Sequence, residues 1–420
     1  MPAVESSYLY WLDSLLLVVT LSDLDIKNVY IFVGDAVRYD KTKEKLAERG
    51  KTLKTIAAST HTPTSFASIF SGKQPTTHGI HGFFQQLGDT PHLFDLENHN
   101  VVFDESGTDF HEWLRIEQQL FGYQQQKPLA EIDEPFVAVD RDIGGHAPYP
   151  PELEDPKEGS RYFKRTGHDI DTLQTDYDDA IDDWFNRLDR RLEILRERGI
   201  EDDTLVIAMS DHGEYLGEYG QIGHDYPAGP ELVYVPTTFI HPDIDPDLDT
   251  SGLFRHVDLM PTLLDILGYD PWPDLPGKNL LNKDLADIGI CYYNRSVNDY
   301  LRRVNPTVAN TMPTMHYEVE AVYDRSGGRS FVQSGYQIRL LVYLFRTFAL
   351  PNGKYTRYNR QFQASYQAIV DTEQKYGSPA FSASEARDIF ETHSAGEEIV
   401  RDDIDLSDES IKQLSDLGYL

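Results

Sequence analysis

Short apolar runs alternate along the first two thirds of the chain with segments in which apolar residues recur at helical spacing. Three runs, at 28–35, 135–142 and 203–214, are rich in β-branched residues and lead into acidic side chains. Such runs are typical of buried parallel strands. Another strand is predicted at 235–240. Residues 170–200 carry apolar positions at helical spacing among many charges, which predicts one long amphipathic helix.

This alternation predicts an α/β fold, with a central, mostly parallel sheet flanked by helices. A further helix is predicted at 256–269, where Gly268 ends it. Active sites of such folds lie at the carboxyl ends of the strands. Side chains that follow the predicted strands are therefore the first candidates for function.

The pattern changes near residue 290. Short antiparallel strands around a turn at Gly327-Gly328 are followed by helical segments. We therefore predict an N-terminal extension at 1–25, an α/β domain at 26–290 and a smaller α+β domain at 291–420.

The stretch ASTHTPTSFASIFSGKQPTTHGIHGF, residues 58–83, places hydroxyl residues ahead of a short apolar helix. Thr62 is predicted as the N-cap, Pro63 as the first helical residue and Gly72 as the end of the helix. Free amides at such an N-terminus suit an anion, and a nearby hydroxyl could attack it. An ordinary capped helix would show the same features. The candidate hydroxyls are those of Thr60, Thr62, Thr64 and Ser65.

Acidic and imidazole side chains follow three of the predicted strands. Because the carboxyl ends of parallel strands meet at one edge of a sheet, these groups are expected to converge. Carboxylates and imidazoles suit Zn²⁺, Mn²⁺, Mg²⁺ or Ca²⁺, and we predict one or two ions. The candidates are Asp35, Asp142 with His146, and Asp211 with His212, followed by His224.

Composition narrows the class of partner. Acidic residues outnumber basic ones 70 to 38, and the formal charge is −32. Such a surface repels nucleic acid and anionic membranes, so neither is an expected partner. The spread of acid along the chain resembles proteins of salt-loving archaea, although an ordinary acidic enzyme is the alternative.

Cys291 is the only cysteine, which excludes an internal disulfide. The apolar run at 15–21 is too short to span a bilayer, so we predict a cytoplasmic protein.

Several motifs resemble the sulfatase family of the alkaline phosphatase superfamily. SDHGEYLGEYGQIGH resembles the metal-binding Asp-His signature of that family, and GHAPYPP resembles its substrate loop. HVDLMPTLLDILGYDPW, PGKNLL and the final LSDLGYL also match family patterns. The similarity runs from about residue 28 to the C-terminus. It implies the superfamily fold and an enzyme that acts on small anionic esters.

The resemblance assigns the nucleophile to Thr62, ten residues before Gly72. Sulfatases carry a Cys/Ser-x-Pro-Ser-Arg motif there. Ser65 matches it, whereas Thr62, Thr64 and Phe66 occupy the places of Cys/Ser, Pro and Arg. Threonine cannot be oxidised to the formylglycine aldehyde of true sulfatases. A threonine nucleophile instead resembles the phosphodiesterase and nucleotide pyrophosphatase branch, which uses two metal ions.

In that branch, an Asp-x-x-x-His pair binds metal, and Asp142 with His146 reproduces it. His224 lies where sulfatases have a lysine that contacts sulfate. Both departures favour phosphoester over sulfate-ester chemistry. The resemblance thus implies one metal at Asp35, Asp211 and His212, which activates Thr62, and a second metal at Asp142, His146 and His224, which activates water.

Some assignments have open alternatives. His146 is either a metal ligand or a substrate contact, and His224 could be a packing residue. The enzyme could be a sulfatase without formylglycine, a group transferase, or an inactive member that binds an anion. Among other candidates, a structural role is favoured for His78, His81, His256 and Arg38, the last as a partner of nearby carboxylates.

Overall fold

The computed structural model describes residues 24–104, 116–149, 159–224, 228–244, 252–282, 285–298, 307, 311–395 and 401–403. The predicted extension at 1–25 lies outside this part except for its last two residues, and so does the final LSDLGYL.

Within the described residues, the main sheet has eight strands, and only β10 among them runs against the others. Their order across the sheet is β11 (Phe254–Arg255), β2 (Lys51–Ile56), β10 (Tyr234–Ile240), β7 (Thr204–Ser210), β1 (Asn28–Gly34), β6 (Phe136–Asp142), β4 (Asn100–Asp104) and β5 (Gln126–Lys127). Every residue of β1, β6 and β7 is buried, as expected for strands covered on both faces. The predicted mostly parallel α/β sheet is confirmed.

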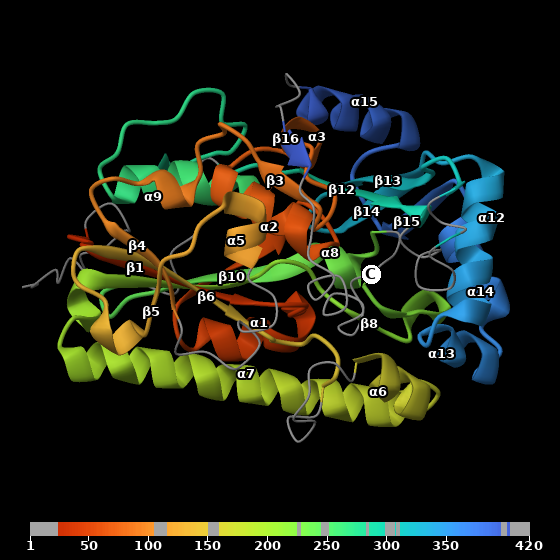
Figure 1. The fold of residues 1–420 in the computed structure, drawn as a ribbon, viewed down its shortest axis with the longest axis horizontal. Coiled ribbons are helices and arrows are strands. Elements are labelled where there is room, and N and C mark those ends of the chain that lie inside the picture. The colour runs from red at the N-terminus through yellow and green to blue at the C-terminus, as the bar shows by residue number, and fades with distance from the viewer. Residues whose placement is uncertain are drawn as a thin grey trace, which may run out of the picture.

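Helices cover both faces of this sheet (Figure 1). On one face lie α1 (Tyr39–Ala47) and α7 (Ile170–Arg198), where Trp184 stacks on Phe32 at 5.7 Å between ring centroids. On the other face lie α2 (Thr62–Ser71), α5 (Ile116–Phe121) and α9 (Leu259–Ile266). The long helix predicted at 170–200 is thus confirmed.

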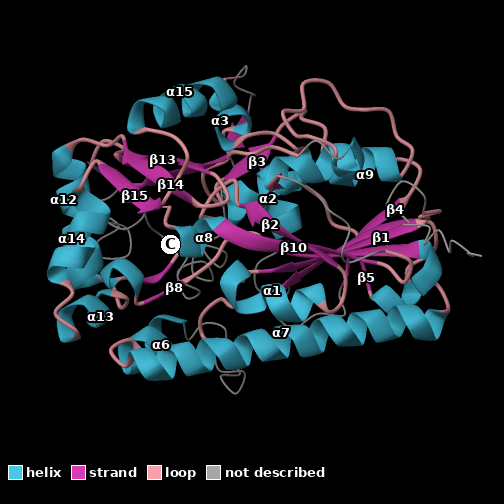
Figure 2. Ribbon diagram, turned by 180° about the vertical axis from the view of Figure 1, so that it is seen from behind, coloured by secondary structure: helices cyan, strands magenta, loops and turns pink. Residues whose placement is uncertain are grey.

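A second, antiparallel sheet packs beside the first (Figure 2). Its strands are β12 (Gly289–Ser296), β13 (His316–Tyr323), β14 (Gly327–Val332) and β15 (Glu373–Gly377). The helices with it are α12 (Tyr336–Leu344), the π-helical turn η9 (Phe345–Ala349), α13 (Gly353–Tyr358), α14 (Phe362–Val370) and α15 (Ala383–Ser394). The Tyr292 amide donates to Ala58 O at 2.8 Å, and buried Cys291 shares a cluster with Ile56, which joins the two sheets.

Short elements complete the described chain. They are α3 (Pro75–His78), β3 (Gln85–Leu87), α6 (Gly159–Thr166), β8 (Tyr215–Leu216), β9 (Ile222–Gly223), α8 (Pro230–Val233), β16 (Arg401–Asp403) and the 3-10 turns η2 (Leu93–Asp95), η3 (Leu129–Glu131), η5 (Glu201–Asp203), η6 (Glu218–Gly220), η7 (His256–Asp258) and η8 (Leu280–Asn282). Strand β16 pairs with β3, so the chain returns to its first half, and a boundary at 290 stays a prediction. No helix among these residues is long and apolar enough to cross a membrane.

The start of α2 differs by one residue from the expectation. His61 is the N-cap, and Thr62 is already helical. No side chain caps this end, and the Thr62 hydroxyl contacts His212. Gly72 ends the helix with φ 69, in the left-handed region that glycine adopts readily, as predicted.

Candidate active site

Asp35, Asp211 and His212 form a buried cluster at the carboxyl ends of β1 and β7. Gly34 lies opposite Ser210 in the parallel register, which brings the next residues of the two strands together. His212 Nε2 is 3.7 Å from Asp35 Oδ1 and 3.5 Å from Asp211 Oδ2. Potential ligand atoms of all three residues lie within 4.8 Å of one another. The convergence predicted from the strand ends therefore holds for these residues.

The backbone around the cluster holds Asp211 in one orientation. Its Oδ1 accepts hydrogen bonds from the amides of Ala36, at 3.2 Å, and His212, at 2.9 Å. Ala36 has φ 59, a strained conformation for a residue with a side chain. The Tyr177 hydroxyl donates to Ala36 O at 2.8 Å and stabilises this turn. Asp211 Oδ1 is thus occupied by two backbone amides, and Oδ2 is the oxygen directed toward the cluster.

Asp211 Oδ2 is buried and accepts no hydrogen bond within the described part of the chain. A buried carboxylate oxygen in that position costs free energy unless a cation meets it. Two carboxylates and one imidazole are also a common donor set for divalent cations. The three residues therefore suit a divalent metal ion on chemical grounds.

The Thr62 hydroxyl lies against the same cluster, with Oγ1 at 3.0 Å from His212 Nε2. His212 Nδ1 approaches Gly213 O at 3.0 Å and must donate to it. In the neutral ring, Nε2 therefore carries the lone pair and accepts from the Thr62 hydroxyl. Among the rival hydroxyls, Ser65 Oγ is occupied in the fold, because it donates to Ser59 O at 2.9 Å.

Two further imidazoles stack beside His212. The His224 ring lies 4.4 Å from that of His212, and the His146 ring lies 5.1 Å from that of His224, between centroids. His146 Nδ1 donates to Ala147 O at 2.7 Å, and His224 Nδ1 donates to Glu214 Oε2 at 2.7 Å. In the neutral form of each ring, Nε2 is therefore the nitrogen with the lone pair. An oxygen acceptor on the other nitrogen is the usual arrangement around metal-binding histidines.

Burial also sets the protonation of these groups. It lowers the pKa of His146 to about 4, although Asp35 opposes the shift, so this ring is neutral at pH 7. Burial raises the pKa of Asp211 to about 6, and the neighbouring charge of Asp35 adds to the effect. For Asp35, burial acts to raise the pKa, but His146 and Arg141 outweigh it and hold the pKa well below its usual range.

Asp142 lies apart from this cluster. Its carboxylate accepts hydrogen bonds from Arg187 Nε at 2.5 Å and Nη2 at 2.7 Å, and Oδ1 also accepts from the Gly144 amide at 2.8 Å. Arg187 comes from α7, so the carboxylate is bound to that helix. The structure thus does not bring Asp142 together with the other predicted ligands. Its backbone still supports the site, because Asp142 O accepts from the Asp35 amide at 2.9 Å.

Sequence reasoning missed Arg141, which is fully buried beside the cluster. Arg141 Nη2 donates to Asp35 Oδ2 at 2.7 Å. Its guanidinium also lies 5.8 Å from the centre of the Phe66 ring. Phe66 occupies the motif position where the sulfatases have arginine, so a positive charge reaches this region from β6. No sequence signal marked Arg141, because the relation depends on two distant segments meeting.

Glu214 is a second residue that the motif analysis left without a role. It is buried, its Oε2 accepts from His224, and its Oε1 accepts from the Tyr149 hydroxyl at 2.7 Å. Glu214 is the last residue of the SDHGE stretch, two residues after His212, and Tyr149 belongs to GHAPYPP. The two motifs therefore meet at one carboxylate, and their presence together was the available signal.

The other residues make contacts of the kind expected for the structural roles predicted for them. His256 Nδ1 accepts from the Ala58 amide at 3.1 Å, and its Nε2 donates to Ser210 O at 3.0 Å. His78 Nε2 is bonded to Ser68 Oγ at 2.9 Å. Arg38 binds Asp40 at 2.9 Å and Glu218 at 2.8 Å. The His81 ring packs against Tyr292 at 5.7 Å.

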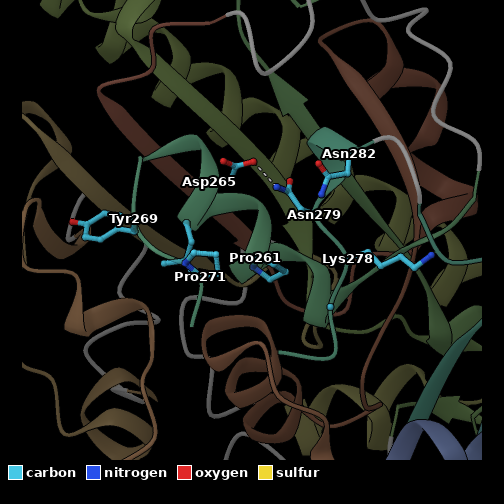
Figure 3. A pocket seen from close by; sticks show the side chains of 9 residues that line it. Pro261, Asp265, Tyr269, Pro271, Lys278, Asn279 and Asn282 are labelled. Carbon is cyan, nitrogen blue, oxygen red and sulfur yellow. Dashed lines mark hydrogen bonds between the residues drawn. The ribbon is translucent and has the colours of Figure 1, made fainter. Parts of the chain in front are cut away.

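A pocket beside α9, of about 480 Å³, contains none of these groups. Figure 3 shows Tyr269, Pro261 and Lys278 around it. Its carboxylate, Asp265, is occupied by Asn279 Nδ2 at 2.5 Å. With no converging imidazoles or carboxylates among its lining residues, this pocket offers little for ester chemistry. The strand-end cluster is the better candidate.

Comparisons with known proteins agree with this fold. The sulfatase family model matches residues 113–269, a range that includes Asp211, His212 and His224 but not Asp35 or Thr62. A low-salt glycan biosynthesis sulfotransferase, Agl7 of Haloferax volcanii, is 31% identical over 94% of this chain and 96% of its own length. An arylsulfatase K of Bos taurus is 36% identical over 21% of this chain and 16% of its own length.

Solved structures share the fold. A phosphonate monoester hydrolase of Agrobacterium radiobacter superposes with a TM-score of 0.54 at 15% identity, covering 82% of this chain and 97% of its own. A 2-O GAG sulfatase superposes with a TM-score of 0.55 at 15% identity, covering 87% and 100%. The chain therefore belongs to the sulfatase family of the alkaline phosphatase superfamily, and it is an ester hydrolase by class.

Proposed function

We propose that this enzyme moves a sulfuryl group from a sulfate ester through Thr62 to a glycan hydroxyl, and to water when no acceptor is bound. The observation that supports it most is the 3.0 Å contact between Thr62 Oγ1 and His212 Nε2, at the N-terminus of α2 and beside two carboxylates. A nucleophilic hydroxyl, a ligand cluster and helix amides meet there.

Asp35, Asp211 and His212 would hold a divalent metal ion, with the Thr62 oxygen as a further ligand. The ion would neutralise the carboxylates and lower the pKa of the Thr62 hydroxyl. The rings of His146 and His224 lie beside that of His212, and either ring could contact the metal or the substrate. Asp142 is left out of this ligand set, because Arg187 occupies its carboxylate.

The chemical steps follow from the chain's own groups. Thr62 Oγ1 forms a bond to sulfur while the bond from sulfur to the leaving oxygen breaks. His146, neutral and with a lone pair on Nε2, is the candidate to accept the hydroxyl proton. His146 then gives this proton to the leaving oxygen. In the second step the acceptor hydroxyl loses its proton to His146 and attacks the sulfur, the bond from sulfur to Oγ1 breaks, and Thr62 Oγ1 takes the proton back. Free amides at the start of α2 would bind the sulfuryl oxygens during both steps.

The charge of the site favours a singly charged ester. Apart from Glu214, whose carboxylate accepts hydrogen bonds from His224 and Tyr149, the charged groups are Asp35, Asp211 and Arg141. These three together carry one negative charge, which a divalent cation would turn into one positive charge. A sulfate ester, with one negative charge, would balance it. A phosphate monoester carries more charge than one such site neutralises.

Phosphoester chemistry is the second candidate, and it concerns phosphodiesters, which also carry a single negative charge. The threonine at the nucleophile position supports it, because formylglycine chemistry is impossible there. The similarity to a glycan sulfotransferase favours a sulfate ester over a phosphodiester as the substrate, because that relative matches nearly the whole chain. It also supports a glycan hydroxyl as an acceptor in addition to water.

A matched set of chromogenic esters tests these alternatives. Aryl sulfate, phosphate monoester and phosphodiester would be assayed in molar KCl with Mg²⁺, Mn²⁺, Ca²⁺ or Zn²⁺, with and without an oligosaccharide acceptor. We expect metal-dependent cleavage of the sulfate, and a sulfated oligosaccharide when the acceptor is present. Faster turnover of the phosphodiester would overturn the sulfate assignment. No turnover of any ester would favour an inactive, anion-binding protein.

The ion pair between Arg141 and Asp35 can be tested without a substrate. Arg141→Gln should lower the free energy of unfolding of metal-free protein by about 3–5 kcal/mol, because it leaves the Asp35 charge buried without this partner. Added metal should restore much of this loss, since the cation would supply the missing positive charge. Urea unfolding with chelator and with metal measures both. Arg187→Gln is the control, because Arg187 serves Asp142, and metal should not rescue it. If added metal restored stability equally in Arg141→Gln and Arg187→Gln, the assignment of Arg141 to the metal site would be wrong.

A further inference from the structure

One segment of the chain departs from the general acidity. Residues 325–370 contain seven basic residues and no Asp or Glu, although 70 of the 420 residues of the chain are acidic. The segment includes α12, η9, α13 and α14, which lie together at the outer end of the second sheet (Figures 1 and 2). A charge pattern so unlike the remaining surface calls for a local explanation.

The same helices expose large apolar side chains. Among the described residues, six large hydrophobic side chains are exposed, and five of them lie within 336–362. Phe348 is 58% exposed and Tyr358 is 66% exposed, and the Phe348 ring stacks on that of Phe362 at 6.3 Å. We call this surface the aromatic-basic patch; its apolar members are Tyr336, Leu344, Phe348, Tyr358 and Phe362.

The second sheet and its helices have a core that does not include these exposed side chains. Val342 on α12 and Ile369 on α14 already bury the inner faces of their helices in the core of the second sheet. Leu344 and Phe348 lie beyond that core and are open to solvent. Apolar groups left exposed in one place are typical of an interaction surface.

Basic groups accompany the apolar ones. Arg360 is exposed, Arg339 and Arg357 are partly exposed, and the Lys354 ammonium donates to Lys164 O of α6. That contact adds the exposed Lys164 and Arg165 side chains to the same side of the molecule. The patch thus combines apolar side chains with positive charge, the combination that binds anionic lipid surfaces.

We propose that the aromatic-basic patch docks this enzyme onto an anionic lipid surface. A second copy of the chain is a poorer occupant, because two such patches face to face would bring like charges together. Nucleic acid is disfavoured by the charge of the whole molecule. The overall charge still repels an anionic membrane, so contact would be limited to this end of the protein and its orientation would be defined.

The patch is connected to the candidate active site. Thr356 Oγ1 of α13 donates to Gly220 O at 3.0 Å, and Gln221 Nε2 donates to Ser365 Oγ of α14 at 2.6 Å. The loop held by these bonds leads directly to His224. Docking would therefore hold the site near the lipid surface, where an ester attached to a lipid could reach it. The docking itself does not depend on which ester the enzyme cleaves.

Flotation with lipid vesicles tests the proposal on the full chain. Wild type should float with phosphatidylglycerol vesicles and not with phosphatidylcholine vesicles. Arg360→Glu should weaken this binding at least about five-fold at moderate salt, from the typical contribution of one basic residue near an anionic surface. Its effect should fade in molar KCl, where the Debye length is about 3 Å. Phe348→Ser should weaken binding at both salt concentrations, because apolar insertion is not screened.

Arg190→Glu is the matched control, since Arg190 is exposed on α7, far along the chain from the patch, and the charge change is equal. It should bind like wild type. All three variants should melt like wild type, because none of these side chains is buried. Equal flotation with both lipids, or equal loss in Arg190→Glu and Arg360→Glu, would overturn the proposal. So would a dimer in solution that Phe348→Ser dissociates, which would identify a second copy as the occupant.

Discussion

Thr62→Ala is expected to lower turnover of a sulfate ester by roughly 10⁴- to 10⁶-fold, the range seen when a catalytic nucleophile is removed. The fold should survive. Thr62 caps no helix amide, and the change removes one hydroxyl that is bonded to His212. Loss of such a hydrogen bond costs about 1 kcal/mol. Steady-state kinetics and thermal unfolding of the same preparation separate the two effects.

Two variants and one chemical experiment locate the nucleophile. Thr62→Ser should retain activity, because attack requires the oxygen and not the methyl group. Thr64→Ala should also remain active, although Thr64 is buried on the same turn of α2. With a slow substrate, peptide mass spectrometry should find the sulfuryl group on Thr62. A label on Thr60 or Thr64, or wild-type turnover by Thr62→Ala, would show that Thr62 is not the nucleophile.

Asp211→Asn is expected to abolish metal binding and activity, yet to stabilise the metal-free protein at pH 7. The pKa of Asp211 is raised to about 6 from an ordinary value of 3.8, so its buried charge destabilises the fold wherever it is ionised. Metal-free wild type should therefore lose stability as the pH rises from about 4 to about 6. The variant should lack this pH dependence, because asparagine has no charge to bury.

Metal analysis and melting curves with chelator check this prediction. Asp104→Asn provides a control, since Asp104 is buried at the end of β4 and accepts from the Tyr30 hydroxyl at 2.6 Å, outside the ligand cluster. It should keep the bound metal. Full metal content in Asp211→Asn would show that Asp211 is not a ligand. If metal-free Asp211→Asn melted at a lower temperature than metal-free wild type at pH 7, the buried charge of Asp211 would not be what destabilises the fold.

Local patterns in the sequence were enough to predict the central sheet, the helix at 170–200 and the convergence of Asp35, Asp211 and His212. These features depend on neighbours along the chain: a buried strand needs continuous apolar residues, and a parallel sheet brings strand ends to one edge. The left-handed end of α2 at Gly72 is equally local, because glycine adopts that conformation readily. The motif resemblance added the family, which the comparisons support independently.

Tertiary structure alone decided which of the candidate side chains meet. Asp142 looks like a ligand in sequence, but Arg187, forty-five residues later, reaches it from α7. Arg141 carries no motif, yet it meets Asp35 from 106 residues away. The exposed face of α12 and α14 likewise became visible only once their inner faces were buried. Ion pairs and exposure depend on distances in space, and local sequence patterns do not encode those distances.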